Sequence, residues 1–395
     1  MKNKTPFIDR LISFLLFLGL TFGLIFIYFA QERHYNTLVY GNLLLGTERY
    51  LRILCVMLVF LVSVLAIFRS KSRYTLNVYA AYVVLLGYIT LNYVLYGADI
   101  FDTTKLMDTK GIGPWICMGL IFVSQNDGIF KNIKIFLFIT VFVIFALSVY
   151  NFIDYGVGAY RGEAIAKYLV YAVNMVWIAP YVFLILKNKV KFAKFRFLVL
   201  LPGVFLALIT QTRSFLLIYF LVLLFDFFHT KKKTLYILFG SILAFGFMAL
   251  LLSSEALSSS YKLLGKRGLE DSRTSQLVQF TDQINIIELV VGKGPDATWS
   301  FSGFAYQHLD NQWMLLLWWG GLIPFLMYFY LTAFIPVKMF LKTDDYETKV
   351  ESFILILWTL ACGGMAIFST MSVEFYFFVI CLIQGRLLHK YSLIK

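Results

Sequence analysis

The stretch that decides the fold is Leu11–Ala30, LISFLLFLGLTFGLIFIYFA, in which no side chain is charged. A helix needs about 20 such residues to cross the hydrocarbon core of a bilayer. Within lipid each backbone polar group must be paired inside its own segment, so the run must be helical. It is too long for the apolar core of a signal peptide and is expected to stay attached as the first spanning helix.

Similar runs recur along the 395 residues, of which 60% are hydrophobic and only 14% charged. An all-α polytopic membrane protein with about 12 transmembrane helices is therefore predicted, in a single integral membrane domain over residues 1–395. The other spans are expected at Leu51–Phe68, Tyr74–Tyr96, Gly113–Gln125, Ile135–Ile153, Ala166–Leu186, Phe197–Gln211, Ser214–Phe228, Thr234–Leu252, Trp313–Pro336, Phe353–Ser372 and Phe375–Leu388.

Basic residues predict the orientation of these helices. With the N-terminus inside, most of the 35 Lys and Arg residues fall in inner segments and most of the 22 Asp and Glu residues in outer ones. This distribution follows the positive-inside rule, so both termini are expected in the cytoplasm. The formal net charge of +13 is spread between the apolar runs and forms no stripe, so nucleic-acid binding is not expected.

One loop is much longer than the others, and loops of this length are usually functional. Residues 253–312 are predicted to be extracytoplasmic, and their half-apolar stretch Gln276–Val291 is expected to form an amphipathic helix on the membrane surface. Gly292–Pro295 lacks the spacing and the hydroxyl residue of a phosphate-binding Walker loop, and no cofactor is expected. Neither a metal site nor a disulfide is expected of the cysteines, which are predicted to be small buried residues. They are Cys55, Cys117, Cys362 and Cys381.

Three arginines are candidates for binding an anion, because a guanidinium offers a planar, always-charged fork suited to phosphate. Arg213 stands in the short polar break Thr210–Ser214 between two apolar runs, where it could equally be a turn marker or reach lipid headgroups. Arg273 lies in the long loop, and Arg161 lies in an outer loop at the expected level of the headgroups. Taken alone, Arg273 could be a solvated loop charge. Asp226, near an inner helix end, is expected to be structural and to reach water.

A polar cluster precedes the apolar helix that begins at Trp313. It contains His308, Asp310 and Asn311, of which the first two are candidates for a general base. Asp310 or Asn311 could instead be the N-cap of the helix, where a side-chain oxygen accepts hydrogen bonds from free backbone N–H groups. The pair Gly320-Gly321 in the same helix predicts close helix packing.

Three of these features, taken together, resemble the O-antigen ligase/polymerase superfamily of bacterial envelope glycosyltransferases. Gln211–Ser214 is similar to that family's T-x-S-R-[ST] element between two helices. Ser272-Arg273 followed by Val291–Pro295 is similar to its S-x-R … G-x-G stretch in a large outer loop. Asn311 with Gly320-Gly321 is similar to its H-N-x-x-L … G-L-x-G element. The resemblance covers mainly residues 200–325.

The resemblance implies a metal-independent glycosyltransferase on the outer face of the bacterial cytoplasmic membrane. It would polymerise undecaprenyl-diphosphate-linked oligosaccharide repeat units into a capsule or O-antigen. Arg213, Arg273, Arg161 and Asn311 would bind substrate, with arginines in place of a divalent cation. The family's histidine position falls on Asp310, so the catalytic base is Asp310 or His308. Implied partners are the lipid-linked glycan donor and acceptor, membrane lipid, a chain-length regulator and a flippase.

Three alternatives remain open. A ligase would transfer finished glycan to another acceptor. In this sequence Asp310, not a histidine, directly precedes Asn311, and this departure from the family's His-Asn pair favours the polymerase. A lipid-linked oligosaccharide flippase or other transporter is disfavoured, because the sequence shows neither a two-fold repeat nor broken helices in matching halves. The third interpretation is a structural or assembly protein of the membrane, and only the three motifs argue against it.

Overall fold

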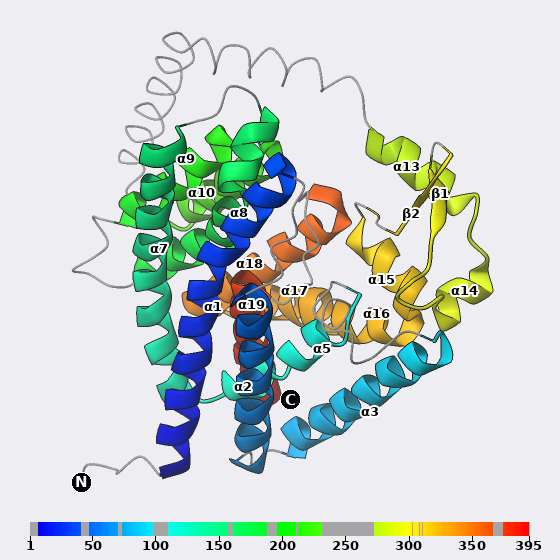
Figure 1. Ribbon diagram of the computed structural model, residues 1–395. Helices are drawn as coiled ribbons and strands as arrows, with labels where there is room; N and C mark the ends of the chain where they lie inside the picture. The colour runs from blue at the N-terminus through cyan, green and yellow to red at the C-terminus, as the bar shows by residue number, and fades with distance from the viewer. Residues whose placement is uncertain are drawn as a thin grey trace. The chain divides into compact units, whose positions relative to one another are not determined.

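The computed structural model describes most of the chain, and the apolar runs within the described residues are helical (Figure 1). The described residues are 7–40, 47–69, 73–97, 110–156, 161–187, 196–210, 212–230, 272–301, 303–307, 309, 311–365 and 374–394. The predicted span Thr234–Leu252, much of the long loop, and both base candidates, His308 and Asp310, lie outside the described residues.

The chain divides into two units, and each is described by itself. The first comprises Met1–Ala30, Leu43–Thr140 and Gln276–Lys395, and the second comprises Gln31–Asn42 and Val141–Ser275. Three helices have residues in both units: α1 (Phe7–Tyr40), α7 (Asp127–Tyr155) and α13 (Ser272–Thr281).

The remaining elements belong to one unit or the other. Those of the first are α2 (Thr47–Arg69), α3 (Arg73–Leu95), α5 (Gly113–Cys117), α6 (Leu120–Val123), α14 (Ile286–Val291), β1 (Trp299–Phe301), β2 (Phe304–Tyr306), α15 (Gln312–Gly320), α16 (Leu322–Phe329), η1 (Tyr330–Phe334), α17 (Ile335–Lys342), α18 (Tyr346–Leu360), η2 (Ala361–Met365) and α19 (Phe375–Ile394). Those of the second are α8 (Arg161–Leu186), α9 (Arg196–Ile209) and α10 (Arg213–Phe228).

Seven helices among the described residues are long and apolar enough to span a membrane. They are Phe7–Glu32, Tyr50–Arg69, Tyr74–Leu95, Asp127–Tyr155, Glu163–Leu186, Leu322–Lys342 and Phe375–Ile394. The prediction of a helical membrane protein is thereby supported, whereas the count of about 12 spans stays a prediction. The long loop adds one feature that was not predicted, an antiparallel hairpin in which β1 pairs with β2.

The predicted span Trp313–Pro336 is not one straight helix. It consists of α15, α16, the π-helical turn η1 and α17, and it breaks at Gly321, whose φ is 83°. The π-helical turn has a local cause, because Pro336 has no N–H to donate to the carbonyl of Thr332 one turn earlier. The hydroxyl of Thr359 on α18 donates to that carbonyl at 2.7 Å and so supplies the missing hydrogen bond.

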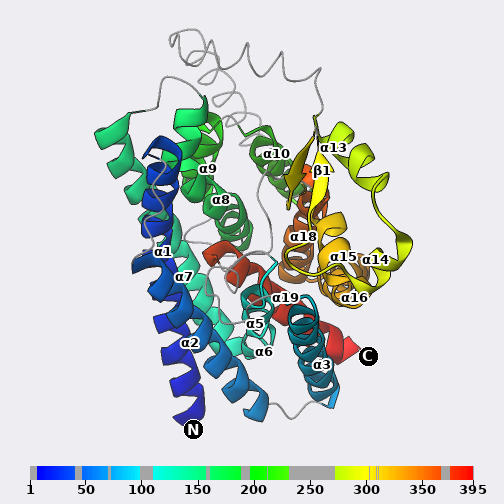
Figure 2. The same cartoon turned by 45° about the vertical axis from the view of Figure 1, so that its right-hand side comes forward.

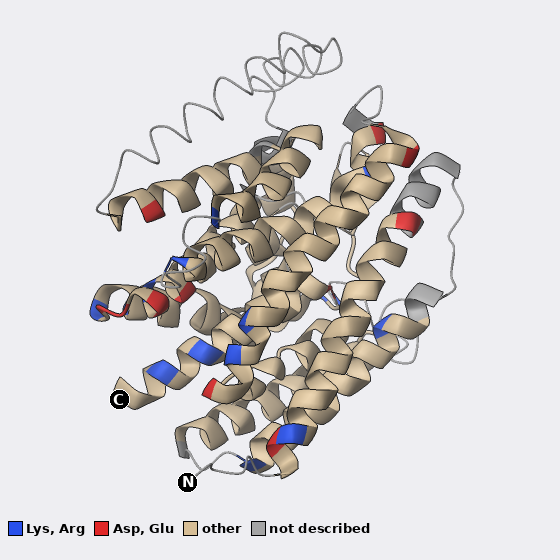
Figure 3. Ribbon diagram, turned by 90° about the vertical axis from the view of Figure 1, so that its left-hand side faces the viewer, with Lys and Arg blue, Asp and Glu red and all other residues tan. Residues whose placement is uncertain are grey.

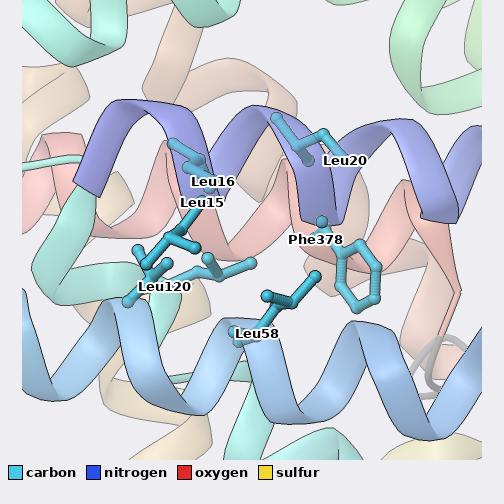
Figure 4. Close-up of a pocket in the computed structure, with 9 residues that line it drawn as sticks. Leu15, Leu16, Leu20, Leu58, Leu120 and Phe378 are labelled. Carbon is cyan, nitrogen blue, oxygen red and sulfur yellow. The ribbon is translucent and has the colours of Figure 1, made fainter. Parts of the chain in front are cut away.

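The core of the first unit is closely packed where α19 crosses α6. A Cβ at Gly385 would overlap the carbonyl oxygen of Ile121, so only glycine allows this approach. An apolar gap beside this crossing is lined by leucines of α1, α2 and α6 and by Phe378 of α19 (Figure 4). Its volume is about 10 Å³, which is at most the space of one water molecule, so it is a packing defect and no ligand site. All four cysteines are buried, as predicted.

The second unit has α8 at its centre. In the most apolar 18-residue stretch of this helix, 83% of the residues are buried. Contrary to the expectation that it reaches water, Asp226 is fully buried near the end of α10. Its carboxylate lies 2.8 Å from a guanidinium nitrogen of Arg196 and 3.1 Å from the amine of Lys187. This arrangement is the usual one for a buried charge, and it supports a structural role for Asp226. Elsewhere, charged residues are sparse along the helices (Figure 3).

Candidate functional site

Two of the family-like motifs meet in the first unit, although they are about 25 residues apart in sequence. The backbone N–H of Lys293 donates to the carbonyl of Trp318 at 2.8 Å, and that of Gly294 donates to the carbonyl of Trp319 at 3.0 Å. These carbonyls belong to the last turn of α15, where helical carbonyls have no partner within the helix. The segment from Gly292 to Gly294 therefore caps the C-terminal end of α15.

Glycine is required on both sides of this contact. Gly292 and Gly321 have φ values of 87° and 83°, in the region that side chains with a Cβ rarely adopt. A Cβ at Gly292 would lie 2.7 Å from the carbonyl oxygen of Trp319, and one at Gly321 would lie 2.7 Å from the carbonyl carbon of Val291. The Gly pair predicted close packing, and the packing is of a loop against a helix end, not of one helix against another.

Two tyrosines, Tyr88 in α3 and Tyr96 directly after its end, hold the same segment from the other side. The hydroxyl of Tyr88 donates to the carbonyl of Val291 at 2.7 Å, and that of Tyr96 donates to the carbonyl of Gly292 at 2.6 Å. Both carbonyls lie at the end of α14, where they would otherwise lack a helical partner. The sequence did not single out these tyrosines, because nothing around them indicates contact with a residue about 200 positions later.

Aromatic packing joins the long loop to α15. Phe280 of α13 is fully buried, with its ring centroid 5.3 Å from that of Trp318 and 5.3 Å from that of Trp299 on β1. The side chain of Gln283 accepts from the N–H of Ser300 at 2.8 Å, which ties the end of α13 to the hairpin. Arg273 lies on α13, about two turns before Phe280, and its side chain is outside the described residues.

Asn311 is the N-cap of α15, which settles one of the alternatives left open by the sequence. Its side-chain oxygen accepts from the N–H of Met314 at 3.1 Å. Gln312, the next residue, is buried and donates to the carbonyl of Leu309 at 3.2 Å. The start of α15 is thus fixed by the Asn311 cap and by the contact between Gln312 and Leu309.

Arg161 and Arg213 both begin helices of the second unit. Arg213 is the first residue of α10, directly after the buried Thr212, and the break between α9 and α10 occurs where the sequence predicts it. The N–H of Thr212 donates to the carbonyl of Ala207 at 3.1 Å, which closes the end of α9. A helix N-terminus presents free N–H groups, so the position favours an anion. The side chains of both arginines are outside the described residues.

A cavity of about 450 Å³ lies in the first unit on the side that the sequence predicts to be cytoplasmic. Its polar lining consists of Asp9, Arg69, Gln125, Asn126 and His389. Arg69 already forms two hydrogen bonds of 2.7 Å to the carboxylate of Asp9, so its charge is largely neutralised. No motif in the sequence indicates this cavity.

A buried ion cluster joins α18 to α19 in the same unit, and the sequence did not indicate it either. Glu351 is fully buried, and its carboxylate lies 2.8 Å from the amine of Lys390, which also donates to Thr348 at 2.8 Å. Burial raises the pKa of Glu351 to about 7, against the opposing effect of Lys390. Arg386 approaches the other carboxylate oxygen at 4.0 Å and pairs with Asp127 of α7.

Within the described ranges, no three His, Cys, Asp or Glu side chains are grouped so that they could hold a metal ion. Comparison with models of protein families, with curated proteins and with solved structures finds no match to the chain.

Proposed function

We propose that the protein polymerises undecaprenyl-diphosphate-linked repeat units into a surface polysaccharide on the outer face of the bacterial cytoplasmic membrane. The observation that carries the proposal is the contact between Gly292–Gly294 and the Gly320-Gly321 break. Two motifs that resemble parts of the glycosyltransferase superfamily in sequence pack against each other through backbone atoms and require glycine to do so. Asn311 begins the same helix that the contact ends.

The proposed reaction needs no nucleotide and no ATP, because the donor arrives already activated by its diphosphate. The acceptor hydroxyl attacks the anomeric carbon of the donor sugar, and the bond from that carbon to the diphosphate oxygen breaks. Arg213 and Arg273 would stabilise the charge on the departing undecaprenyl diphosphate, since preorganised cations stabilise developing charge most strongly in a partly dry site. Asp310 or His308 would take the proton of the acceptor hydroxyl.

The arginines are tested by Arg213→Ala and Arg273→Ala, each expressed in a strain from which the native gene is deleted. Both variants should lose polymer, with membrane insertion and protein level unchanged. Arg→Lys at either position should restore little, because a point charge does not reproduce a bidentate fork. Lys349→Ala is the control, since it removes a basic residue that only pairs weakly, at 3.7 Å, with Asp344. Polymer at the wild-type level in both alanine variants would show that neither arginine has this role.

The base is tested by His308→Ala, Asp310→Ala and Asp310→Asn. A positioned base typically contributes ~10²–10⁴-fold to the rate, so its loss should be visible as lost polymer. A neutral imidazole has an ordinary pKa of ~6.5, whereas a carboxylate near ~3.9 needs burial to become an effective base. Activity in Asp310→Asn together with loss in His308→Ala assigns the role to His308. Activity in all three variants means that neither residue is the base.

A transporter, such as a lipid-linked oligosaccharide flippase, is the second candidate, and one observation favours it. Helices break at Gly321 and at Gly364, where φ is 83° and 113°, and broken helices are typical of transporters. Both breaks fall in the C-terminal part of the chain, however, and not at matching positions of two halves. The lipid-linked intermediates of a deletion strain separate the functions. Single repeat units outside the membrane indicate a polymerase, finished chains indicate a ligase, and units retained inside indicate a flippase.

A further inference from the structure

Helix α14 exposes nearly all of its apolar side chains. Ile286, Ile287, Val290 and Val291 are 76%, 67%, 50% and 53% exposed, and no residue of the helix is buried. At about 100° per residue, these four positions occupy one continuous arc of the helix. Glu288 lies beyond the edge of the arc and forms an ion pair of 3.0 Å with Lys293. An apolar arc bordered by charge is typical of a helix that lies in a membrane interface.

The place of α14 in the first unit points to the same environment. Tyr88, whose hydroxyl binds the carbonyl of Val291, lies seven residues before Leu95, the end of the candidate span on α3. Seven residues of helix correspond to about 10 Å. Tyr96, which binds the carbonyl of Gly292, directly follows that end. The end of α14 is therefore held beside the last two turns of a candidate membrane span.

The neighbours of α14 expose apolar side chains as well. On the last turns of α3, Leu91 and Val94 are 55% and 57% exposed. On α16, which begins the candidate span Leu322–Lys342, Ile323 and Leu326 are 46% and 52% exposed. Figures 1 and 2 show α14 beside the end of α3 and beside α16. The exposed face of α14 thus continues the apolar surfaces of two helices that can span a bilayer.

We propose that α14 is inserted into the membrane leaflet at the C-terminal end of α3, with its four exposed apolar residues among lipid acyl chains. The Glu288–Lys293 ion pair then lies at the level of the headgroups. Inserted in this way, α14 keeps Gly292–Gly294 and the C-terminal end of α15 at the membrane surface, where the phosphate of a lipid-linked molecule lies. The insertion itself does not depend on the proposed glycosyltransferase activity.

The test is the depth of nitroxide labels on the full chain, reconstituted in phosphatidylethanolamine–phosphatidylglycerol vesicles. Labels at Ile287→Cys and Val290→Cys are compared with Leu91→Cys, an exposed site on a candidate span, and with Asp344→Cys, in an exposed polar turn. The native cysteines are buried, so the introduced thiol is the one that reacts. Relaxation of each label by oxygen, which concentrates in lipid, is measured against relaxation by a water-soluble nickel chelate.

The expected oxygen-to-nickel ratios at positions 287 and 290 are close to that of Leu91→Cys and several-fold above that of Asp344→Cys. Ratios equal to that of Asp344→Cys overturn the proposal. Short label-to-label distances between copies, with nickel excluded, also overturn it, because a second copy of the chain then covers α14. Each variant is first compared with the parent in thermal unfolding, and the two label positions serve as independent measurements.

Discussion

Replacing Gly321 by Ala tests the contact on which the candidate site depends. The backbone at Gly321 has φ 83° and ψ −174°, a conformation that is essentially restricted to glycine and costs other residues ~1–3 kcal/mol. The added Cβ would also lie 2.7 Å from the carbonyl carbon and oxygen of Val291, and such overpacking costs another ~1–3 kcal/mol. The expected loss of stability is therefore about 2–6 kcal/mol, a large part of the ~5–15 kcal/mol that holds a typical protein folded.

Two other glycines provide matched controls. Gly303, in the hairpin turn, has nearly the same φ of 84°, but no described atom lies within 4 Å of an added Cβ. Gly303→Ala should therefore show only the conformational cost. Gly87 lies inside α3, likewise with no described atom within 4 Å of an added Cβ, so Gly87→Ala should be neutral or stabilising by ~0.4–1 kcal/mol.

The assay is thermal unfolding of the purified protein in detergent, followed by tryptophan fluorescence. Two of the seven tryptophans, Trp318 and Trp319, lie at the contact, where their carbonyls accept the N–H groups of the capping segment. The midpoint should be highest for the parent and Gly87→Ala, lower for Gly303→Ala and lowest for Gly321→Ala. A Gly321→Ala midpoint equal to that of Gly303→Ala would refute the backbone contact.

Three further predictions follow from the charged residues. Because burial raises the pKa of Glu351 from 4.5 to about 7, its contribution to stability is complete below about pH 4.5 and is lost as the pH rises through 7. The unfolding midpoint should fall over that window, and Glu351→Gln should flatten the fall; an unchanged slope contradicts the assignment. Asp226→Ala should cost ~3–5 kcal/mol in urea or thermal unfolding, because the buried Arg196 and the partly buried Lys187 lose their carboxylate; a cost below ~1 kcal/mol contradicts the buried pair. In intact cells an impermeant thiol reagent should label Ser259→Cys but not Lys232→Cys, and the reverse pattern overturns the predicted topology.

Much of the fold follows from local sequence, because the length of an apolar run determines whether a helix can cross a bilayer. The run Leu11–Ala30 lies within α1, and the polar break at Thr210–Ser214 is the turn between α9 and α10. Burial of the cysteines is equally local, since each lies inside an apolar run. For the candidate site, the sequence predicted the motifs and their order but not which of Asp310 and Asn311 caps α15.

What the sequence determined by itself is thus a set of apolar helices, their breaks and a small group of polar residues between them. Only the tertiary structure decided that Trp313–Pro336 is broken at Gly321 and that Gly292–Gly294 caps the end of α15. It alone showed that Tyr88 and Tyr96 hold this segment and that Glu351 is buried against Lys390. The physical reason is the range of the interactions. Hydrophobic run length acts within one segment, whereas free carbonyls at a helix end and buried charges are satisfied by partners that folding brings from distant parts of the chain.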